Sequence, residues 1–308
     1  MNILKTYRAL FVLLVFLVGT NAPLPAHPSQ NSAATSAEST AHILLTTLDS
    51  SGNPVLAPPK DTVQLKIARQ LVEIEEIRSL SNSPLFFSIL VDLSGSSREF
   101  ADKQVSATTR LFSNLSTGDN HGYLILFRDE LATDDQFIRP TAVENILKRF
   151  PAQSRSGGTA LYDAILHAAT VQLTSTKTPR DSRRAIFVLS DGGENSSHTT
   201  LNETLKVLQA EQIPVYSIGF SHSKDSDSPR ELEWELGILK ALSEATGGWG
   251  TFLDEPGDFI GRAVSLINAQ CLASFKLPTL KPGKSYPLKI ESSMRDVHLL
   301  AAKAYIVR

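Results

Sequence analysis

The chain has 308 residues, of which 42% are hydrophobic and 20% are charged. These ordinary globular values exclude a disordered chain, a collagen and a coiled coil, and the length predicts one large domain with a smaller one, or a single decorated domain. With 30 basic and 32 acidic residues the formal charge is −2, so no overall field favours nucleic acid or an anionic membrane surface. A single cysteine excludes an intramolecular disulfide and a cysteine-rich zinc site.

Residues 1–26 have the pattern of a secretory signal peptide. Lys5 and Arg8 precede a ten-residue apolar run at 9–18, and small residues follow up to a cleavage point near Ala26. Ten helical residues cover about 15 Å, too little for a bilayer core of about 30 Å. A retained signal-anchor is the alternative. We expect an exported chain, secreted or periplasmic, whose mature form has no membrane span.

Residues 27–41 are polar and low in complexity, which predicts a flexible tether. Residues 42–83 then show the alternation of apolar and polar side chains that is typical of strands, for example at Val63, Leu65 and Ile67. The segment 49–54 has the composition of a turn between strands. We predict a β-rich N-terminal flank over 42–83.

Strand-like and helix-like patterns alternate from residue 84 to residue 272. Apolar runs typical of buried parallel strands occur at 85–91, 123–127, 185–189 and 215–220. Helical spacing occurs at 101–115, 159–173, 201–212 and within 231–246. This alternation predicts an α/β fold with a doubly wound, mostly parallel sheet and helices on both of its faces.

Shorter elements complete the prediction. Residues 137–138 and 251–253 are expected to be short strands, and a final helix is expected to carry Cys271 on its buried face as an inert thiol. Strand patterns return at 274–277, 286–290 and 298–307. We predict a β-rich C-terminal flank over 273–308 that pairs with residues 42–83, so that the α/β unit is inserted between two parts of a small β-rich region.

Three polar turns in the α/β unit carry the candidate chemistry. The first predicted strand ends in a D-x-S-x-S pattern, Thr159 follows a pair of glycines at the start of a helix, and Asp191 follows the third buried strand. The first pattern contributes Asp92, Ser94 and Ser96. Ligands bind at the carboxyl ends of the strands in open α/β sheets, so we expect these side chains to converge there.

Two carboxylates and three hydroxyls are hard oxygen donors, which suit Mg²⁺, Mn²⁺ or Ca²⁺ rather than zinc or copper. Two carboxylates balance a 2+ charge without exceeding it, so a cation with an open coordination position could bind a carboxylate from outside. Each turn alone is more simply explained as a helix cap or a loop. The interpretation depends on all three occurring in order at the ends of predicted elements.

On these residues, the chain resembles a von Willebrand factor type A domain with a metal-ion-dependent adhesion site. The family motif is D-x-S-x-S, then a distant Thr and a distant Asp, and it matches Asp92, Ser94, Ser96, Thr159 and Asp191. The resemblance covers residues 84–272, and the segments 157–161 and 189–192 are also similar to the family. It implies that the serines and Thr159 reach a Mg²⁺ ion directly, with Mn²⁺ or Ca²⁺ as alternatives, and that an aspartate acts through water. The flanks more loosely resemble a bacterial group of secreted proteins that contain such a domain.

Other functions have weaker support in the sequence. There is no G-x-G-x-x-G turn, H-E-x-x-H motif or G-x-S-x-G elbow, and the Gly283-Lys284-Ser285 run lacks the upstream glycine of a phosphate loop. A magnesium phosphohydrolase with Asp92 as its nucleophile is an alternative, but such sites usually have a second carboxylate two residues later as the acid/base, and that position holds Ser94. A structural module, with a metal that only braces loops, is the other alternative. We expect a non-enzymatic module, without catalytic residues, that binds an acidic side chain of another protein. The polar loop 221–230 is more simply a solvated connector, and the alternative is that it forms the rim of the site and selects the partner.

Overall fold

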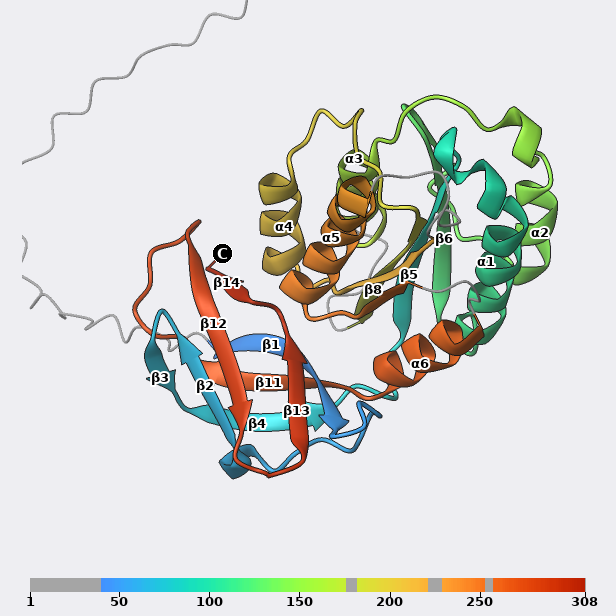
Figure 1. Ribbon diagram of the computed structural model, residues 1–308. Helices are drawn as coiled ribbons and strands as arrows, with labels where there is room; N and C mark the ends of the chain where they lie inside the picture. Colours follow the sequence, from blue (N-terminus) through green and yellow to red (C-terminus); the bar gives the residue numbers. More distant parts are fainter. Residues whose placement is uncertain (1–39, 176–181, 221–228, 253–256, 308) are drawn as a thin grey trace, which may run out of the picture. The chain divides into compact units, whose positions relative to one another are not determined.

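The computed structural model describes residues 40–175, 182–220, 229–252 and 257–307 (Figure 1). The predicted signal peptide, nearly all of the predicted tether and most of the loop 221–230 lie outside these residues. The first described strand begins at Thr40, so the last two residues of the predicted tether are part of a strand.

A six-stranded sheet, with the order β10-β9-β8-β5-β6-β7, forms the centre of the α/β region. Its strands are parallel except for β7, which pairs antiparallel with β6. The central strand β5 is buried along its whole length, as expected for a strand covered on both faces. The strands are β5 (Leu85–Asp92), β6 (His121–Phe127), β7 (Leu131–Ala132), β8 (Arg183–Ser190), β9 (Val215–Gly219) and β10 (Gly250–Phe252).

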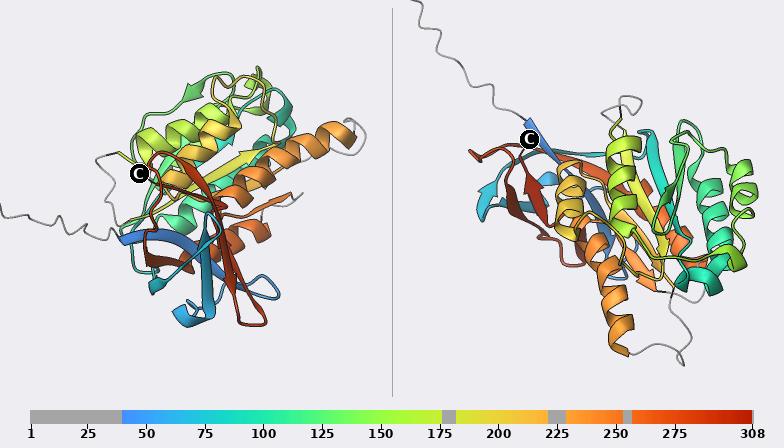
Figure 2. Two further views of the ribbon diagram at one scale, coloured as in Figure 1. Left: turned by 90° about the vertical axis from the view of Figure 1, so that its left-hand side faces the viewer. Right: turned by 90° about the horizontal axis from the view of Figure 1, so that it is seen from above.

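Helices cover both faces of this sheet (Figures 1 and 2). Phe87 and alternate β5 residues pack with α1, α2 and α6, whereas Phe86 and Leu90 pack with α3, α4 and α5. This two-faced core confirms the predicted doubly wound α/β fold. The helices are α1 (Ala101–Leu115), α2 (Pro140–Leu147), α3 (Leu161–His167), α4 (Leu201–Ala210), α5 (Pro229–Thr246) and α6 (Gly257–Asn268). Helix α2 was not predicted, although Pro140 at its first position is a common helix-start signal.

Two antiparallel four-stranded sheets, β13-β1-β11-β4 and β14-β12-β2-β3, combine strands from before and after the α/β region. Strand β1 pairs with β11, and β2 pairs with β12. Their shared core includes Ile43, Leu65 and Phe275. The boundaries at residues 84 and 272 stay predictions. The strands are β1 (Thr40–Asp49), β2 (Val63–Ile67), β3 (Gln70–Val72), β4 (Ile74–Ser79), β11 (Gln270–Lys276), β12 (Ser285–Ser292), β13 (Val297–Ala301) and β14 (Ala304–Ile306).

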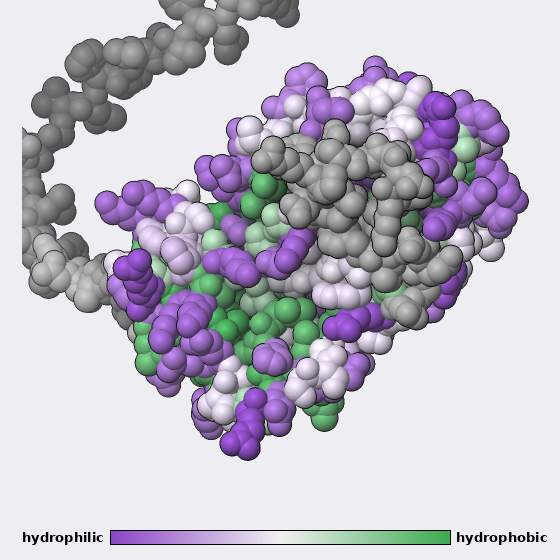
Figure 3. All heavy atoms as spheres, viewed as in Figure 1, coloured by the Kyte–Doolittle hydropathy of each residue, from purple (hydrophilic) through white to green (hydrophobic). Residues whose placement is uncertain are grey.

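The surface differs between the two regions. On the face shown in Figure 3, hydrophilic residues dominate around α1 and α2, and apolar residues gather over the sheets that contain β12 and β13. In the parts of the chain that the structure describes, no helix combines the length and the apolar character that a membrane crossing requires.

The predicted edge strand at 137–138 is wrong, because the antiparallel edge strand is β7 at Leu131–Ala132. Phe137 instead packs its ring against neighbouring aromatic side chains, with its centroid 4.5 Å from that of His121 and 4.8 Å from that of Tyr123. Its neighbour Ile138 donates its backbone N–H to Gly122 O at 2.8 Å. Aromatic packing explains the apolar pair without a strand.

The predicted helical position of Cys271 is also wrong. Helix α6 ends at Asn268 and β11 begins at Gln270, so a single residue separates them and Cys271 lies on the strand. The helical spacing of apolar residues continued past the true end of the helix because Cys271 is buried in the flanking sheets instead. Burial raises the pKa of its thiol to about 11, so the thiol is protonated at neutral pH.

Phe87 is a test of this core. Its ring is fully buried, with centroids 5.3 Å from Phe112 and 6.2 Å from Phe187. Phe87→Ala should lower the free energy of unfolding by about 3–5 kcal/mol, because it leaves a cavity between sheet and helix. Leu71→Ala, at a side chain that is 68% exposed, should change it by less than about 0.5 kcal/mol. Urea denaturation of both variants checks this, and equal effects would contradict the assigned core.

Candidate metal centre

The predicted site residues lie at the carboxyl end of the parallel sheet. Strands β5 and β8 are parallel neighbours, and they end at Asp92 and Ser190, directly before Asp191. Both aspartates are buried. The Ser190 hydroxyl donates a hydrogen bond to Asp92 Oδ2 at 2.6 Å, which joins the two strand ends through a side chain.

The D-x-S-x-S segment folds back on its own aspartate. Asp92 Oδ1 accepts a hydrogen bond from the backbone N–H of Ser94 at 2.8 Å, an Asx-type turn. This turn places the hydroxyls of Ser94 and Ser96 3.1 Å apart. The Ser97 hydroxyl lies within hydrogen-bond distance of two backbone carbonyls of the turn, 2.9 Å from Asp92 O and 3.0 Å from Ser94 O. Ser94 is buried and Ser96 is exposed, so the pair of hydroxyls leads from the interior to the surface.

Asp92 and Asp191 repel each other. Burial, and then the nearby charge of Asp191, raise the pKa of Asp92 from its ordinary value of 3.8 to about 7. Hydrogen bonds from Ser190 and Ser94 oppose that rise. Asp191 Oδ1 accepts a hydrogen bond from Gly193 N at 3.0 Å, which fixes the second carboxylate. A buried carboxylate whose ionisation is opposed by a neighbouring carboxylate is typical of a cation site.

The turn that carries Thr159 needs its two glycines. Gly157 has a φ of +89°, and a Cβ there would collide with the carboxylate of Asp129. A Cβ on Gly158 would collide with the side chains of Ser196 and Asn195. The left-handed φ of Gly157 favours glycine at that position, and any residue larger than glycine at 158 would displace the side chains of Asn195 and Ser196.

Backbone hydrogen bonds connect this turn to both other segments. Gly95 N donates to Gly157 O at 3.3 Å. Thr159 N donates to Asn195 Oδ1 at 2.9 Å, and the backbone N–H groups of Asn195 and Ser196 both donate to Thr159 O at 3.1 Å. The Thr159 turn is therefore held between the D-x-S-x-S segment and the segment that follows Asp191.

The structure thus brings Asp92, Ser94 and Ser96 together, places Asp191 close enough to Asp92 to raise its pKa, and ties the Thr159 turn to both. These hard oxygen donors fit Mg²⁺, Mn²⁺ or Ca²⁺, because a dication would remove the repulsion between the two carboxylates. Among the described residues there is no group of three or more His, Cys, Asp and Glu side chains arranged to hold a metal. Hydroxyl oxygens would therefore have to complete any metal centre here.

Sequence reasoning missed three residues that organise the site: Ser190, Arg155 and Asn195. Ser190 binds the carboxylate of Asp92, Asn195 binds the backbone of Thr159, and Arg155 Nη1 donates to Asp92 O at 3.2 Å. Their proximity to predicted ligands in the chain was the only available signal. Nothing in the local sequence says which distant group each side chain reaches.

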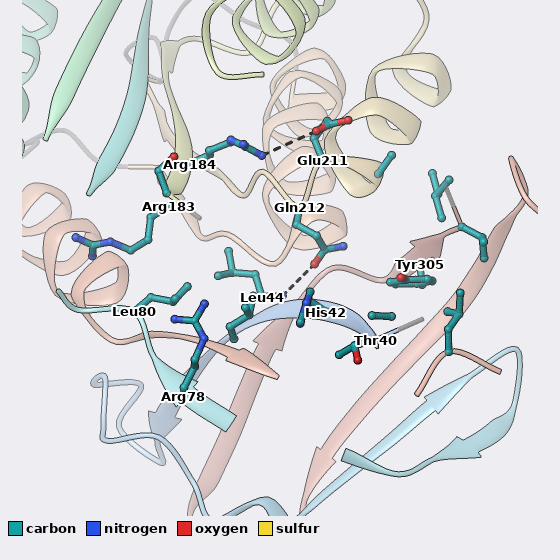
Figure 4. A pocket seen from close by; sticks show the side chains of 17 residues that line it. Thr40, His42, Leu44, Arg78, Leu80, Arg183, Arg184, Glu211, Gln212 and Tyr305 are labelled. Atoms are coloured by element: carbon teal, nitrogen blue, oxygen red, sulfur yellow. Dashed lines mark hydrogen bonds and ion pairs between the residues drawn. The ribbon is translucent and has the colours of Figure 1, made fainter. Parts of the chain in front are cut away.

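A separate cavity of about 410 Å³ lies near the start of β8 (Figure 4). Several of its polar and charged side chains are engaged within the chain. Arg184 Nη1 lies 3.9 Å from the carboxylate of Glu211, and Gln212 Oε1 accepts a hydrogen bond from Leu44 N at 3.0 Å. Arg183 points away from Arg184 and donates to the backbone carbonyls of Ser83 and Ile267. This cavity lies at the amino end of the strand and is distinct from the candidate metal centre.

No match was found among curated protein sequences. The solved structures that are similar to the chain include the following three. BatB from Bacteroides thetaiotaomicron is 18% identical, covers 59% of this chain and 96% of its own, and has a TM-score of 0.45. A von Willebrand factor type A protein from Catenulispora acidiphila is 12% identical over 88% of this chain and 75% of its own (TM-score 0.43). Proximal thread matrix protein 1 from the mussel byssus, with a zinc-occupied MIDAS motif, is 12% identical over 65% of this chain and 48% of its own (TM-score 0.48).

Residues 88–233 match the family model of the von Willebrand factor type A domain. The matched range includes β5, β8 and the three polar turns described above. The parallel sheet with helices on both faces agrees with that fold. Residues 88–233 of this chain are a von Willebrand factor type A domain.

Proposed function

We propose that this chain is an exported, non-enzymatic interaction module that binds an acidic side chain of a partner protein through a divalent cation. The ligands are Asp92, Ser94, Ser96, Thr159 and Asp191, and Mg²⁺ is the expected ion, with Mn²⁺ or Ca²⁺ as alternatives. Domains of this family often mediate protein interactions. The observation that carries the proposal is the buried Asp92–Asp191 pair beside the adjacent hydroxyls of Ser94 and Ser96.

The protein groups prepare the site before a partner arrives. Ser190 and the Ser94 backbone hold both carboxylate oxygens of Asp92, so its orientation is fixed. Ser94 is buried and Ser96 is exposed, so the donor set opens toward solvent on the Ser96 side. When bound, a dication would supply a Lewis-acidic position for a carboxylate oxygen from outside. Export is supported by the leader-like pattern of residues 1–26.

The residue two positions after Asp92 disfavours the phosphohydrolase alternative. That residue is Ser94, which offers no carboxylate for proton transfer. In the structural alternative, the metal only braces loops and needs no exposed ligand. Ser96 is exposed, which favours a site that is open to a partner.

The direct test is partner capture from the exported protein fraction by the full mature chain. Mg²⁺ should support capture, EDTA should abolish it, and added Mg²⁺ should restore it, because the cation forms the contact. Asp92→Asn should fail to capture in all three conditions. Capture that persists in EDTA would overturn the proposed mechanism, and metal-dependent stability without metal-dependent capture would favour the structural module.

Asp92→Asn should also weaken Mg²⁺ binding by more than about 100-fold, because it removes one of two charged ligands while keeping the shape of the side chain. Isothermal titration calorimetry on metal-free protein measures this. Asp119→Asn is the matched control, at an exposed aspartate just before β6, at the opposite end of the parallel strands. The control should bind Mg²⁺ like the wild type, and a loss of affinity in both variants would argue against the assigned ligands.

The stability of the metal-free protein should depend on pH through Asp92. Its folded pKa of about 7 exceeds the ordinary value of 3.8, so the folded state holds a proton that the unfolded state has released. This contribution therefore makes unfolding easier as pH rises from about 4 to about 7. In EDTA, the melting midpoint of the wild type should be lower at about pH 8 than at about pH 5, and this difference should be smaller in Asp92→Asn. Saturating Mg²⁺ should raise the midpoint of the wild type most at the higher pH. The same dependence of the midpoint on pH in both proteins would contradict the assignment to Asp92.

A further inference from the structure

Arg155 is a buried arginine beside the candidate metal centre, and it is not one of the proposed ligands. Its side chain is only 2% exposed, and it lies in the loop between α2 and α3. Its hydrogen-bond acceptors are carbonyl, hydroxyl and amide oxygens rather than carboxylates. Among the described residues its Nε–H has no acceptor. A buried cation that is satisfied only in part carries a stability cost, so packing alone does not explain it.

One guanidinium nitrogen of Arg155 holds the D-x-S-x-S segment. Nη1 donates to Asp92 O and to Ser97 O, each at 3.2 Å, so it binds the backbone on both sides of Ser94 and Ser96. In return, Arg98 Nη2 donates to Arg155 O at 2.9 Å. The D-x-S-x-S segment and the loop that contains Arg155 are therefore joined by hydrogen bonds donated from each side.

The same nitrogen also reaches the Asp191 segment, through Gln104. It donates to Gln104 Oε1, and Gln104 Nε2 donates to Leu189 O at 3.2 Å, two residues before Asp191. Arg155 also precedes Thr159 by four residues in the same loop. A single guanidinium thus contacts the Asp92 segment directly, the Asp191 segment through one side chain, and the Thr159 segment through the chain itself.

We propose that Arg155 is the positioning residue of this metal centre and holds its three segments in register. This inference rests on the proposed function, and it adds a residue outside the ligand set. Arg155 binds the backbone carbonyl of Asp92 and not its carboxylate. It acts through the backbone of Asp92 and Ser97 and through Gln104.

The experiment uses the full mature chain and Mg²⁺ alone as the probe, with affinity measured by calorimetry on metal-free protein. Arg155→Met should weaken Mg²⁺ binding about 10–100-fold, as expected when a group that orients metal ligands is lost. Arg155→Lys keeps the charge and one donor, and it should recover part of that loss. Gln104→Met keeps Arg155 and removes only the link to β8, so it should give an intermediate loss even if Arg155→Met fails to fold.

Arg183→Met is the matched control. Arg183 is also buried, and its guanidinium also binds backbone carbonyls, at the opposite end of β8. It should lower the urea midpoint to a similar extent while Mg²⁺ affinity stays within about 3-fold, because it touches no metal-binding segment.

Three outcomes overturn the inference. Unchanged or tighter Mg²⁺ binding in Arg155→Met and Gln104→Met would show that the segments do not need Arg155. An equal loss in Arg183→Met would show a general effect of stability. A wild-type protein that binds no Mg²⁺ would overturn the proposed function and this inference together, whereas normal wild-type binding with unaffected variants overturns only the role of Arg155.

Discussion

Repulsion between two buried carboxylates is the constraint on which the rest of the site depends. Asp92 and Asp191 are brought together because they follow the ends of neighbouring parallel strands, and burial removes the water that would screen them. The chain opposes this repulsion only in part, with hydrogen bonds from Ser190 and from the Ser94 backbone. A cation bound between the two carboxylates would remove the repulsion that remains.

The surrounding loops keep that arrangement from relaxing. If the two carboxylates could move apart, the repulsion would be relieved and the cation site lost. The hydrogen bonds between Thr159 and Asn195, between Gly95 and Gly157, and from Arg155 to the Asp92 backbone prevent this. The absence of side chains at 157–158 avoids collisions with the side chains of Asp129, Asn195 and Ser196. Contacts within the chain therefore hold the three segments of the site close together.

The sequence predicted the features that depend on local spacing. Alternating strands and helices predicted the doubly wound sheet, and the D-x-S-x-S spacing predicted that Asp92, Ser94 and Ser96 converge on one turn. The hydrogen bonds of Ser190, Arg155 and Asn195 could not be predicted, because each joins groups between 36 and 98 residues apart. Cys271 was misplaced because an apolar residue at helical spacing can be buried equally well by a following strand. Phe137 was misplaced because ring packing and strand pairing both require apolar residues.

The junction between α6 and β11 has a mechanical consequence. Only Ala269 separates the helix from a strand that is paired on both sides, with β1 and with β4. Arg262 adds a second anchor, since its guanidinium donates to Gly52 O in the turn after β1 at 2.9 Å. Moving α6 along the parallel sheet would therefore also move a strand that is hydrogen-bonded on both sides. The flanking sheets restrain the position of this helix, so a displacement of α6 would be transmitted to the β-rich region.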